Sequence, residues 1–259
     1  VIYGFYMFSF SMVSQKNSLC LESLWELGIY YYEIDVEQTI SLSLPFTISN
    51  VCMKYDSTQK MNCLSSENNE EREAAISEAM ETATKAISVR SPFVVIRPEQ
   101  LLLPSTTSPS EEDRIERKQV GDMRLEGYCR ALFTLSKSFP EITFCILPAS
   151  SWNEFPYIPE LRLILSDLAN EKIAYWHNTA SACLLEKEQI CEQGEWIDVF
   201  ANNVVGIHWE DLANDYMLGR EYTFPSDDKH NDSYKKIIKS LLENKKSLWN
   251  TISWNLDLK

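Results

Sequence analysis

Two short segments constrain the fold more than any other part of the sequence. They are IAYWHNTASA, residues 173–182, and VVGIHWEDL, residues 204–212. In each segment, a short apolar run ends abruptly in a cluster of polar side chains. A parallel strand that is buried on both faces has such an apolar run, and its C-terminal end is where functional groups gather. We therefore predict two parallel strands with functional residues at their C-terminal ends.

The same layout recurs along the whole chain. Apolar segments typical of strands alternate with amphipathic segments typical of helices. We expect strands within residues 1–13, 29–36, 40–48, 92–100 and 142–150, from 173, from 204, and within 248–258. We expect helices over residues 17–28, 70–88, 117–139 and 159–169, from about 184, and over 234–244.

Eight such strand and helix units predict an α/β protein with one domain over residues 1–259, folded as a single (β/α)8 TIM barrel. A barrel of this kind commonly takes about 250 residues, and the chain has 259. An open, doubly wound sheet would be expected to carry a glycine-rich phosphate turn. Neither GxGxxG nor GxxxxGK[ST] occurs in the sequence, so the closed barrel is favoured.

The net charge restricts the class of partner. With 38 acidic and 24 basic residues, the formal net charge is −14. A nucleic acid backbone or an anionic membrane surface would repel such a protein at long range. We therefore expect a small molecule as the partner, with no nucleic acid and no membrane. The sequence does not indicate an oligomeric state.

The apolar start of the chain and the cysteines both favour a cytoplasmic protein. The first 13 residues are apolar but fall short of the roughly 20 residues that a membrane span needs, and no basic segment precedes them as in a signal peptide. The seven cysteines show no CxxC or other metal-ligand spacing, so we expect reduced thiols. They are Cys20, Cys52, Cys63, Cys129, Cys145, Cys183 and Cys191.

The two opening segments resemble motifs of a known family. They are similar to WHDTGHA and HxxD, which the xylose-isomerase-like TIM barrels, the sugar phosphate isomerase/epimerase family, carry on strands six and seven. The resemblance implies isomerase or epimerase activity on a sugar or sugar phosphate. It also implies a divalent metal such as Mn, Mg or Zn, held by carboxylates and histidines at the strand ends. Two positions differ, since Asn178 replaces an aspartate and Ser181 a histidine.

Further positions depart from the metal ligands that the resemblance implies. The strand-five glutamate is replaced by Leu147, which cannot bind a cation, and Arg97 adds a positive charge at the same end of the barrel. Ser43 stands where the third strand commonly has a histidine. Glu33, His208, Asp211 and Asp257 remain as ligand-type residues. We therefore predict that the family metal site is lost and that the protein has no cofactor.

The retained residues suggest roles in proton transfer and binding. Glu33 and His208 are the predicted catalytic groups, because acid/base catalysis can proceed without metal if an enolate is otherwise stabilised. Arg97 and Arg220 are candidates to hold a phosphate or carboxylate with a guanidinium fork. The remaining predicted substrate-binding residues are His177, Asn178, Trp209 and Asp211.

Each of these residues also has a structural interpretation. Glu33 and Arg97 could form a buried ion pair, which is the pairing that we expect in the empty protein. His177 could be a neutral, hydrogen-bonded histidine of the barrel, and the tryptophans could be ordinary packing residues. The alternative function is therefore a catalytically inactive barrel that binds a carbohydrate-like ligand or a protein partner. A nuclease is excluded by the charge and the missing ligands.

Overall fold

The structure is a computed structural model of the 259-residue chain. It describes residues 9–13, 31–37, 47–54, 63–104, 106, 109–209 and 251–254.

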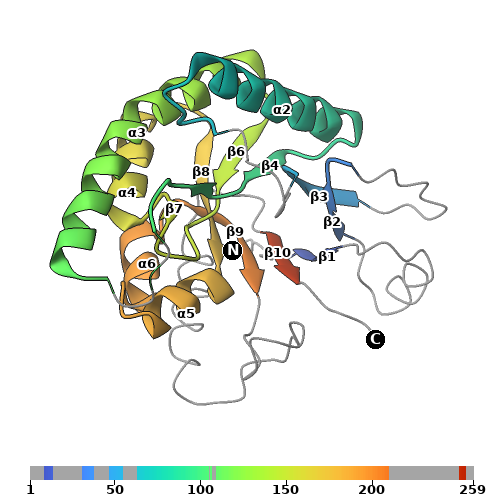
Figure 1. Cartoon of the computed structure of the whole chain (residues 1–259). Helices are drawn as coiled ribbons and strands as arrows, with labels where there is room; N and C mark the ends of the chain where they lie inside the picture. The colour runs from blue at the N-terminus through green and yellow to red at the C-terminus, as the bar shows by residue number, and fades with distance from the viewer. Residues whose placement is uncertain are drawn as a thin grey trace, which may run out of the picture.

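In the described residues, eight strands close into a barrel, and each strand is parallel to its two neighbours (Figure 1). Their order around the barrel is β1, β10, β9, β8, β6, β4, β3, β2, with β2 paired to β1 again. The predicted TIM-barrel fold is therefore confirmed. The barrel strands are β1 (Ser9–Val13), β2 (Tyr31–Asp35), β3 (Thr47–Cys52), β4 (Phe93–Ile96), β6 (Thr143–Ile146), β8 (Ile173–Asn178), β9 (Val204–Trp209) and β10 (Thr251–Trp254). A small antiparallel pair, β5 (Glu99–Gln100) with β7 (Glu154–Phe155), lies outside the barrel.

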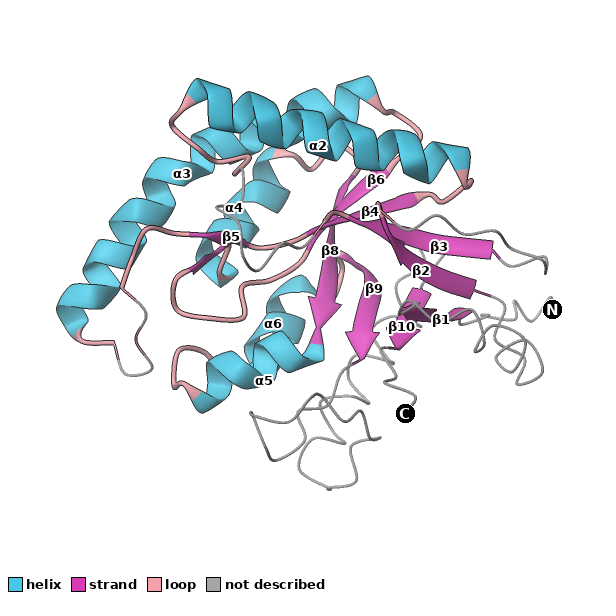
Figure 2. Ribbon diagram, turned by 45° about the vertical axis from the view of Figure 1, so that its right-hand side comes forward, coloured by secondary structure: helices cyan, strands magenta, loops and turns pink. Residues whose placement is uncertain are grey.

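The described helices follow one another around the outside of the barrel (Figure 2). They are α2 (Asn69–Ser88), α3 (Glu111–Ser138), α4 (Ile158–Asp167), α5 (Thr179–Lys187) and α6 (Gln193–Phe200). None of these helices is long and apolar enough to cross a membrane. The helices predicted over 17–28 and 234–244 lie outside the described residues.

Helix α3 begins six residues before the predicted start at 117, because a capping box fixes its first turn. The backbone N–H of Asp113 donates to Ser110 Oγ at 3.1 Å, and the backbone N–H of Ser110 donates to Asp113 Oδ2 at 2.7 Å. These bonds satisfy two donors that a helix start would otherwise leave unpaired. A serine followed by an acid three residues later, as at Ser110 and Asp113, is the sequence signal of this cap.

The third strand lies further along the chain than predicted. The structure places β3 at Thr47–Cys52, which overlaps the predicted segment at residues 47 and 48 and continues four residues past its end, while residues 40–46 lie outside the described residues. One feature of the sequence explains why the strand was expected to end at Ile48. Asn50 interrupts the apolar run, yet it is buried inside the barrel, where it serves the polar cluster described below.

Among the described residues, the buried apolar side chains form two separate groups. The outer core lies between the strands and the helices and includes Ile34, Val51, Ile96 and Tyr175. The inner cluster fills the barrel itself and consists of Cys52, Phe93, Val95, Cys145, Leu147, Ala174 and Trp176. Because side chains alternate between the two faces of a strand, membership of one group or the other shows which way each residue points.

Candidate active site at the barrel mouth

Four polar side chains gather where β2, β3 and β9 approach their C-terminal ends. They are Glu33 on β2, Asn50 and Cys52 on β3, and His208 on β9. Each is at most 6% exposed. In a parallel barrel the strand ends meet at one mouth, so β9 joins β2 and β3 there although it is far from them in the sequence. The four side chains form one buried cluster, called the polar cluster below.

Two β-bulges set the direction in which these side chains point. Tyr32 pairs with Ile48 and Glu33 with Asn50, so Ser49 is an extra residue in β3. As a result, the strand changes phase, and Asn50 and Cys52 point into the barrel. Bulges commonly re-aim side chains next to active sites.

A second bulge lies between β8 and β9. Tyr175 pairs with Val204 and Trp176 with Gly206, so Val205 is the extra residue in β9. Beyond this bulge Ile207 belongs to the outer core, and His208 points to the inside. The sequence signal for this arrangement is weak, because a bulge is invisible in a simple alternation of apolar and polar residues.

The polar cluster is centred on a hydrogen-bonded pair. His208 Nε2 lies 2.6 Å from Glu33 Oε2. Asn50 Nδ2 donates a hydrogen bond to the same carboxylate oxygen. Asn50 is itself oriented by Ser49, whose hydroxyl donates to Asn50 Oδ1 at 2.6 Å. Burial and these fixed partners hold the carboxylate and the imidazole in one relative orientation.

The electrostatics of the cluster keep Glu33 ionised. Burial alone would raise the pKa of Glu33, but the charge of His208 and hydrogen bonds from His208, Asn50 and Cys52 lower that pKa to about 2. Cys52 behaves in the opposite way, because burial and the neighbouring Glu33 carboxylate raise the pKa of its thiol well above the usual value. At neutral pH the cluster therefore contains a carboxylate and a protonated thiol.

Arg97 lies at the same mouth, but its ion pair is with Asp35 and not with Glu33 as predicted. Arg97 Nη2 lies 3.0 Å from Asp35 Oδ1, and Arg97 Nε donates to the backbone oxygen of Met53 at 3.0 Å. The side chains of Arg97 and Asp35 are 26% and 39% exposed. Glu33 and Asp35 both point inward, two residues apart on β2, and Asp35 is closer to the strand end. The arginine that follows β4 therefore meets the outer carboxylate, while Glu33 is paired with His208.

The side of the mouth formed by β6 and β8 is built differently. Leu147, directly after β6, is buried in the inner cluster beside Trp176. The side chain of Asn178 accepts a hydrogen bond from the backbone N–H of Ser181 at 2.9 Å and so caps α5. A divalent cation of the family type requires carboxylate or imidazole ligands at these positions. Leucine, a capping amide and serine do not fit such a cation.

His177 does not belong to the polar cluster, although it was predicted to bind substrate. Trp176 and Asn178 point to the inside and the mouth, so the residue between them points toward the helices. There, Tyr175 Oη lies 2.6 Å from His177 Nδ1. The side chain is fully buried, and burial lowers its pKa to about 3. His177 is therefore a neutral residue of the outer core.

Several predicted site residues lie where the structure describes no side chain. Asp211 and Arg220 are outside the described residues, as are Ser43 and Asp257. Trp209 ends β9, but only its backbone is described. Their roles stay predictions.

Sequence reasoning missed Asn50 and Cys52. The reason is the misplaced third strand, which put the expected functional residue at Ser43. Asn50 and Cys52 are two residues apart and therefore share one face of a strand, but the bulge at Ser49 decides that this face is the inner one.

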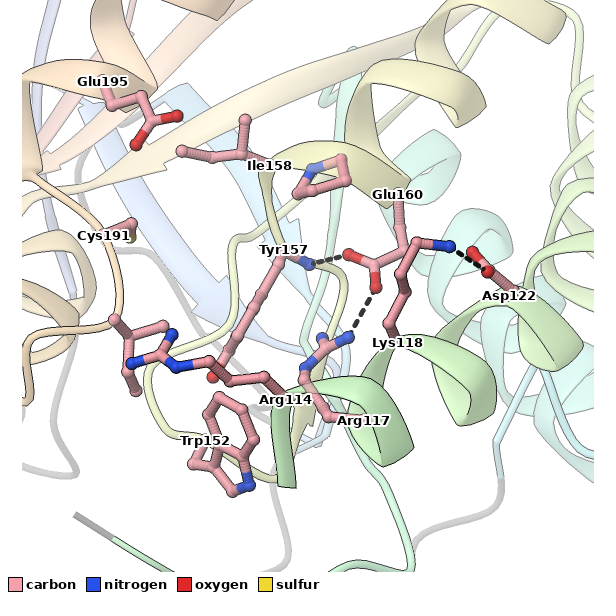
Figure 3. A pocket seen from close by; sticks show the side chains of 12 residues that line it. Arg114, Arg117, Lys118, Asp122, Trp152, Tyr157, Ile158, Glu160, Cys191 and Glu195 are labelled. Carbon is pink, nitrogen blue, oxygen red and sulfur yellow. Dashed lines mark hydrogen bonds and ion pairs between the residues drawn. The ribbon is translucent and has the colours of Figure 1, made fainter. Parts of the chain in front are cut away.

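A cavity of about 290 Å³ lies outside the barrel, between α3, the start of α4 and the segment before α6 (Figure 3). Its floor is a buried ion pair between Arg117 and Glu160. The Arg117 guanidinium lies 3.8 Å from the centre of the Tyr157 ring, and Glu160 accepts from the Tyr157 backbone N–H at 2.9 Å. Arg117 also donates to the backbone oxygen of Glu154. These contacts tie the segment after β7 to α3, which is a structural role.

Comparison with known protein families and sequences gives little information about function. A family profile described as "Protein of unknown function (DUF1266)" matches residues 207–254, from β9 to β10. No curated protein sequence matches the chain.

Solved structures show clear similarity in fold. The 3-keto-D-glucoside 4-epimerase YcjR from E. coli superposes with a TM-score of 0.64 at 11% identity, over 98% of this chain and 94% of that one. A xylose isomerase domain protein from Planctomyces limnophilus gives a TM-score of 0.65 at 12% identity, over 96% and 90% of the two chains. D-Psicose 3-epimerase from Clostridium cellulolyticum H10 gives 0.61 at 11% identity, over 96% and 85%. The chain therefore has the xylose-isomerase-like TIM-barrel fold to which its sequence motifs point.

Proposed function

We propose that the protein is an isomerase or epimerase that moves a proton on a sugar or sugar phosphate at the C-terminal mouth of the barrel. The observation that carries this proposal is the buried pair of Glu33 and His208, with 2.6 Å between Oε2 and Nε2. Similar structures include epimerases of sugars. Because one fold serves many reactions, the proposal rests on the pair and not on the fold.

The pair has the parts that a proton-transfer step requires. Isomerisation and epimerisation next to a carbonyl need a base that takes a proton from carbon and returns it. In the tautomer that donates its Nε2–H to Glu33, His208 has Nδ1 as its basic nitrogen. When the imidazole takes up a proton, the ionised Glu33 stabilises the resulting positive charge. A carboxylate that orients and stabilises an imidazolium in this way is a recurring catalytic arrangement.

Arg97 is the proposed anion-binding residue at the rim of the site. Its guanidinium is partly exposed and lies against Asp35. A phosphate or carboxylate on the substrate could replace Asp35, because the planar fork binds either group through two parallel hydrogen bonds. The same positive charge would stabilise an enolate. No step is assigned to a metal at the family positions, since Leu147, Asn178 and Ser181 do not fit one.

The test is hydrogen exchange at carbon. Sugars and sugar phosphates are incubated with the protein in deuterated water, and deuterium in the sugar is followed by mass spectrometry. His208→Asn should lower the exchange rate by roughly 10²–10⁴-fold, the usual contribution of an acid/base residue. His177→Asn is the matched control, because that histidine is equally buried but faces the helices, and it should leave the rate unchanged. Equal rates in wild type and His208→Asn would overturn the proposed role.

Arg97 is tested by the charge of the ligand. Arg97→Ala should weaken binding of sugar phosphates and leave binding of neutral sugars less affected. A ligand that binds only the native state raises the melting temperature by mass action, so a thermal-shift series with both classes of ligand is a direct measurement. If both classes bind equally well to wild type and variant, Arg97 is not part of the site.

A second candidate function is a barrel that binds a carbohydrate-like ligand without turning it over. The observation that favours it is the apolar side of the mouth, where Leu147 stands at the position of a family glutamate and packs with Trp176 in the inner cluster. In that case a sugar should raise the melting temperature while no deuterium enters it. The two measurements together separate the candidates.

A further inference from the structure

Three side chains of the polar cluster offer the atoms that bind transition metals. Glu33 has a carboxylate oxygen, Cys52 a thiol sulfur and His208 an imidazole nitrogen, and these three atoms lie within 4.8 Å of one another. Glu33 and Cys52 lie on the paired strands β2 and β3, and barrel closure brings His208 on β9 to them. All three side chains are buried.

The spacing suits a small tetrahedral ion. Zinc binds sulfur at about 2.3 Å and nitrogen or oxygen at about 2.0–2.2 Å, so neighbouring ligand atoms in a tetrahedron are roughly 3.4 Å apart. Small side-chain shifts would bring the three atoms from their present positions to that distance. Binding of the metal would displace the Cys52 thiol proton to solvent. The set then combines thiolate, imidazole and carboxylate, which favours zinc or cobalt over magnesium or calcium, because the latter prefer oxygen ligands alone.

The surroundings of these atoms resemble the outer shell of a metal site. Asn50 Nδ2 donates to Glu33 and lies 3.8 Å from Cys52 Sγ. Ser49 in turn fixes the Asn50 side chain through its hydroxyl. Groups that hydrogen-bond to metal ligands orient them, and their loss typically lowers metal affinity by roughly 10–100-fold.

We propose that Glu33, Cys52 and His208 form a binding site for a zinc-type transition metal ion. The site retains Glu33 and His208, two of the ligand-type residues noted in the sequence. It differs from the site that the resemblance implies because Cys52 is the third ligand and the positions of Leu147, Asn178 and Ser181 take no part. Bound metal would occupy the lone pairs of Glu33 and His208. The inference therefore uses the same pair as the proposed function, and metal binding and proton transfer by this pair exclude each other.

Cobalt is the probe for the proposed site, because a thiolate bound to Co²⁺ gives a sulfur-to-metal charge-transfer band. The whole protein, freed of metal with a chelator, is titrated with Co²⁺ and then with Zn²⁺. Wild type should show the charge-transfer band at one equivalent and lose it when zinc displaces cobalt. A protein that shows no charge-transfer band at any cobalt concentration would overturn the proposal.

Matched variants locate the site. Cys52→Ala should abolish the charge-transfer band, while Cys145→Ala should keep it, because Cys145 is equally buried in the inner cluster but is not part of the three-ligand group. Asn50→Ala should weaken cobalt binding by roughly 10–100-fold. Circular dichroism of each variant verifies folding, and Glu33→Gln provides a second ligand variant if Cys52→Ala does not fold. Loss of the band in Cys145→Ala with retention in Cys52→Ala would place the metal elsewhere.

Activity separates this inference from the proposed function. If both are right, added Zn²⁺ should slow deuterium exchange into the sugar, and a chelator should restore it. Cobalt binding at Cys52 without any exchange would overturn the proposed function and leave the metal site intact. If deuterium exchange depends on His208 but the protein binds no cobalt, the metal site is overturned and the proposed function is kept.

Discussion

The two sides of the barrel mouth have opposite character. On one side, β2, β3 and β9 supply the polar cluster, with Asp35 and Arg97 at its rim. On the other side, β6 and β8 supply Leu147 and Trp176, which pack together in the barrel. Both sides derive from the same feature, the C-terminal ends of parallel strands. The difference shows that a strand end can serve chemistry or packing, and that side-chain contacts decide which.

The two sides also differ in buried charge, because one side contains a carboxylate and the other has neutral residues in its place. Glu33 is stabilised as an anion by His208 and Asn50, so its burial is compensated. Across the mouth, the capping amide of Asn178 and the apolar Leu147 need no compensation. We expect substitutions on the polar side to affect mainly binding and reactivity. Substitutions on the packing side should affect mainly stability.

The largest expected effect is on the packing side. Trp176 is fully buried, and its ring contacts Phe93 and His208 edge-on at centroid distances of 5.9 and 5.6 Å. Trp176→Ala should lower the free energy of unfolding by about 3–5 kcal/mol, as for other buried aromatic residues replaced by alanine. Urea unfolding followed by circular dichroism measures the change. A loss below about 1 kcal/mol would show that Trp176 is not a packing residue, and the contrast between the two sides would fail.

Glu99 is a second buried carboxyl, and it contrasts with Glu33 because the hydrogen bonds from Leu64 and Ser65 and the charge of Arg124 do not offset its burial. It accepts hydrogen bonds from the backbone and side chain of Ser65, but burial raises its pKa from 4.5 to about 7. The folded protein therefore favours the protonated form of Glu99. The resulting contribution to the free energy of unfolding is present in full below pH 4.5 and is lost as the pH rises through about 7.

Glu99→Gln should remove this decrease in the free energy of unfolding with rising pH, because glutamine does not ionise. On the scale of 1.36 kcal/mol per pKa unit, wild type should lose up to about 3 kcal/mol relative to the variant as the pH rises across this range. Unfolding free energies of both proteins at several pH values give the difference directly. Parallel curves would mean that Glu99 does not titrate in this range.

Gly206 tests how tightly the two sides fit against each other. A Cβ at this position would clash with the ring of Trp176, which leaves no room for it. Gly206→Ala should lower the unfolding free energy by about 1–3 kcal/mol through overpacking. Gly194→Ala is the matched control, because no atom lies within 4 Å of its added Cβ. In helix α6 that change should raise stability by up to about 1 kcal/mol. The same loss in both variants would rule out overpacking against Trp176.

The sequence was sufficient to predict the barrel and the mouth. Apolar runs that end in polar residues located the strands that carry Glu33 and His208, because strand direction in a parallel barrel brings their ends together. It could not predict the partner of each charge. Glu33 and Arg97 looked like a natural ion pair, but the inward-facing residues of β2 are two carboxylates at different depths, and barrel closure places His208 opposite the deeper one.

The alternation of side chains along a strand explains the remaining differences between the predicted and the observed site, which concern His177 and the polar residues of β3. His177 lies between two inward-facing residues, so period-two alternation alone would have placed it on the helix side. By contrast, Asn50 and Cys52 depend on the bulge at Ser49, which shifts the phase of β3 by one residue. A phase shift of this kind reverses every side chain that follows. Pattern reasoning from one sequence therefore had the information for His177 but not for the polar residues of β3.

The smallest expected effect on stability is at the rim of the polar side. The ion pair between Asp35 and Arg97 is partly exposed, with 39% and 26% of the two side chains accessible. Exposed ion pairs contribute only about 0.2–1 kcal/mol, and salt screens them, so Asp35→Asn should change the unfolding free energy by less than about 1 kcal/mol. The same variant removes the carboxylate that competes with an anionic ligand for Arg97. Its melting temperature should therefore rise more than that of wild type when a sugar phosphate is added, and both proteins should respond equally to a neutral sugar. A weaker response of Asp35→Asn to the sugar phosphate would mean that Asp35 orients Arg97 for the ligand, and that this rim, like the packing side, acts through structure.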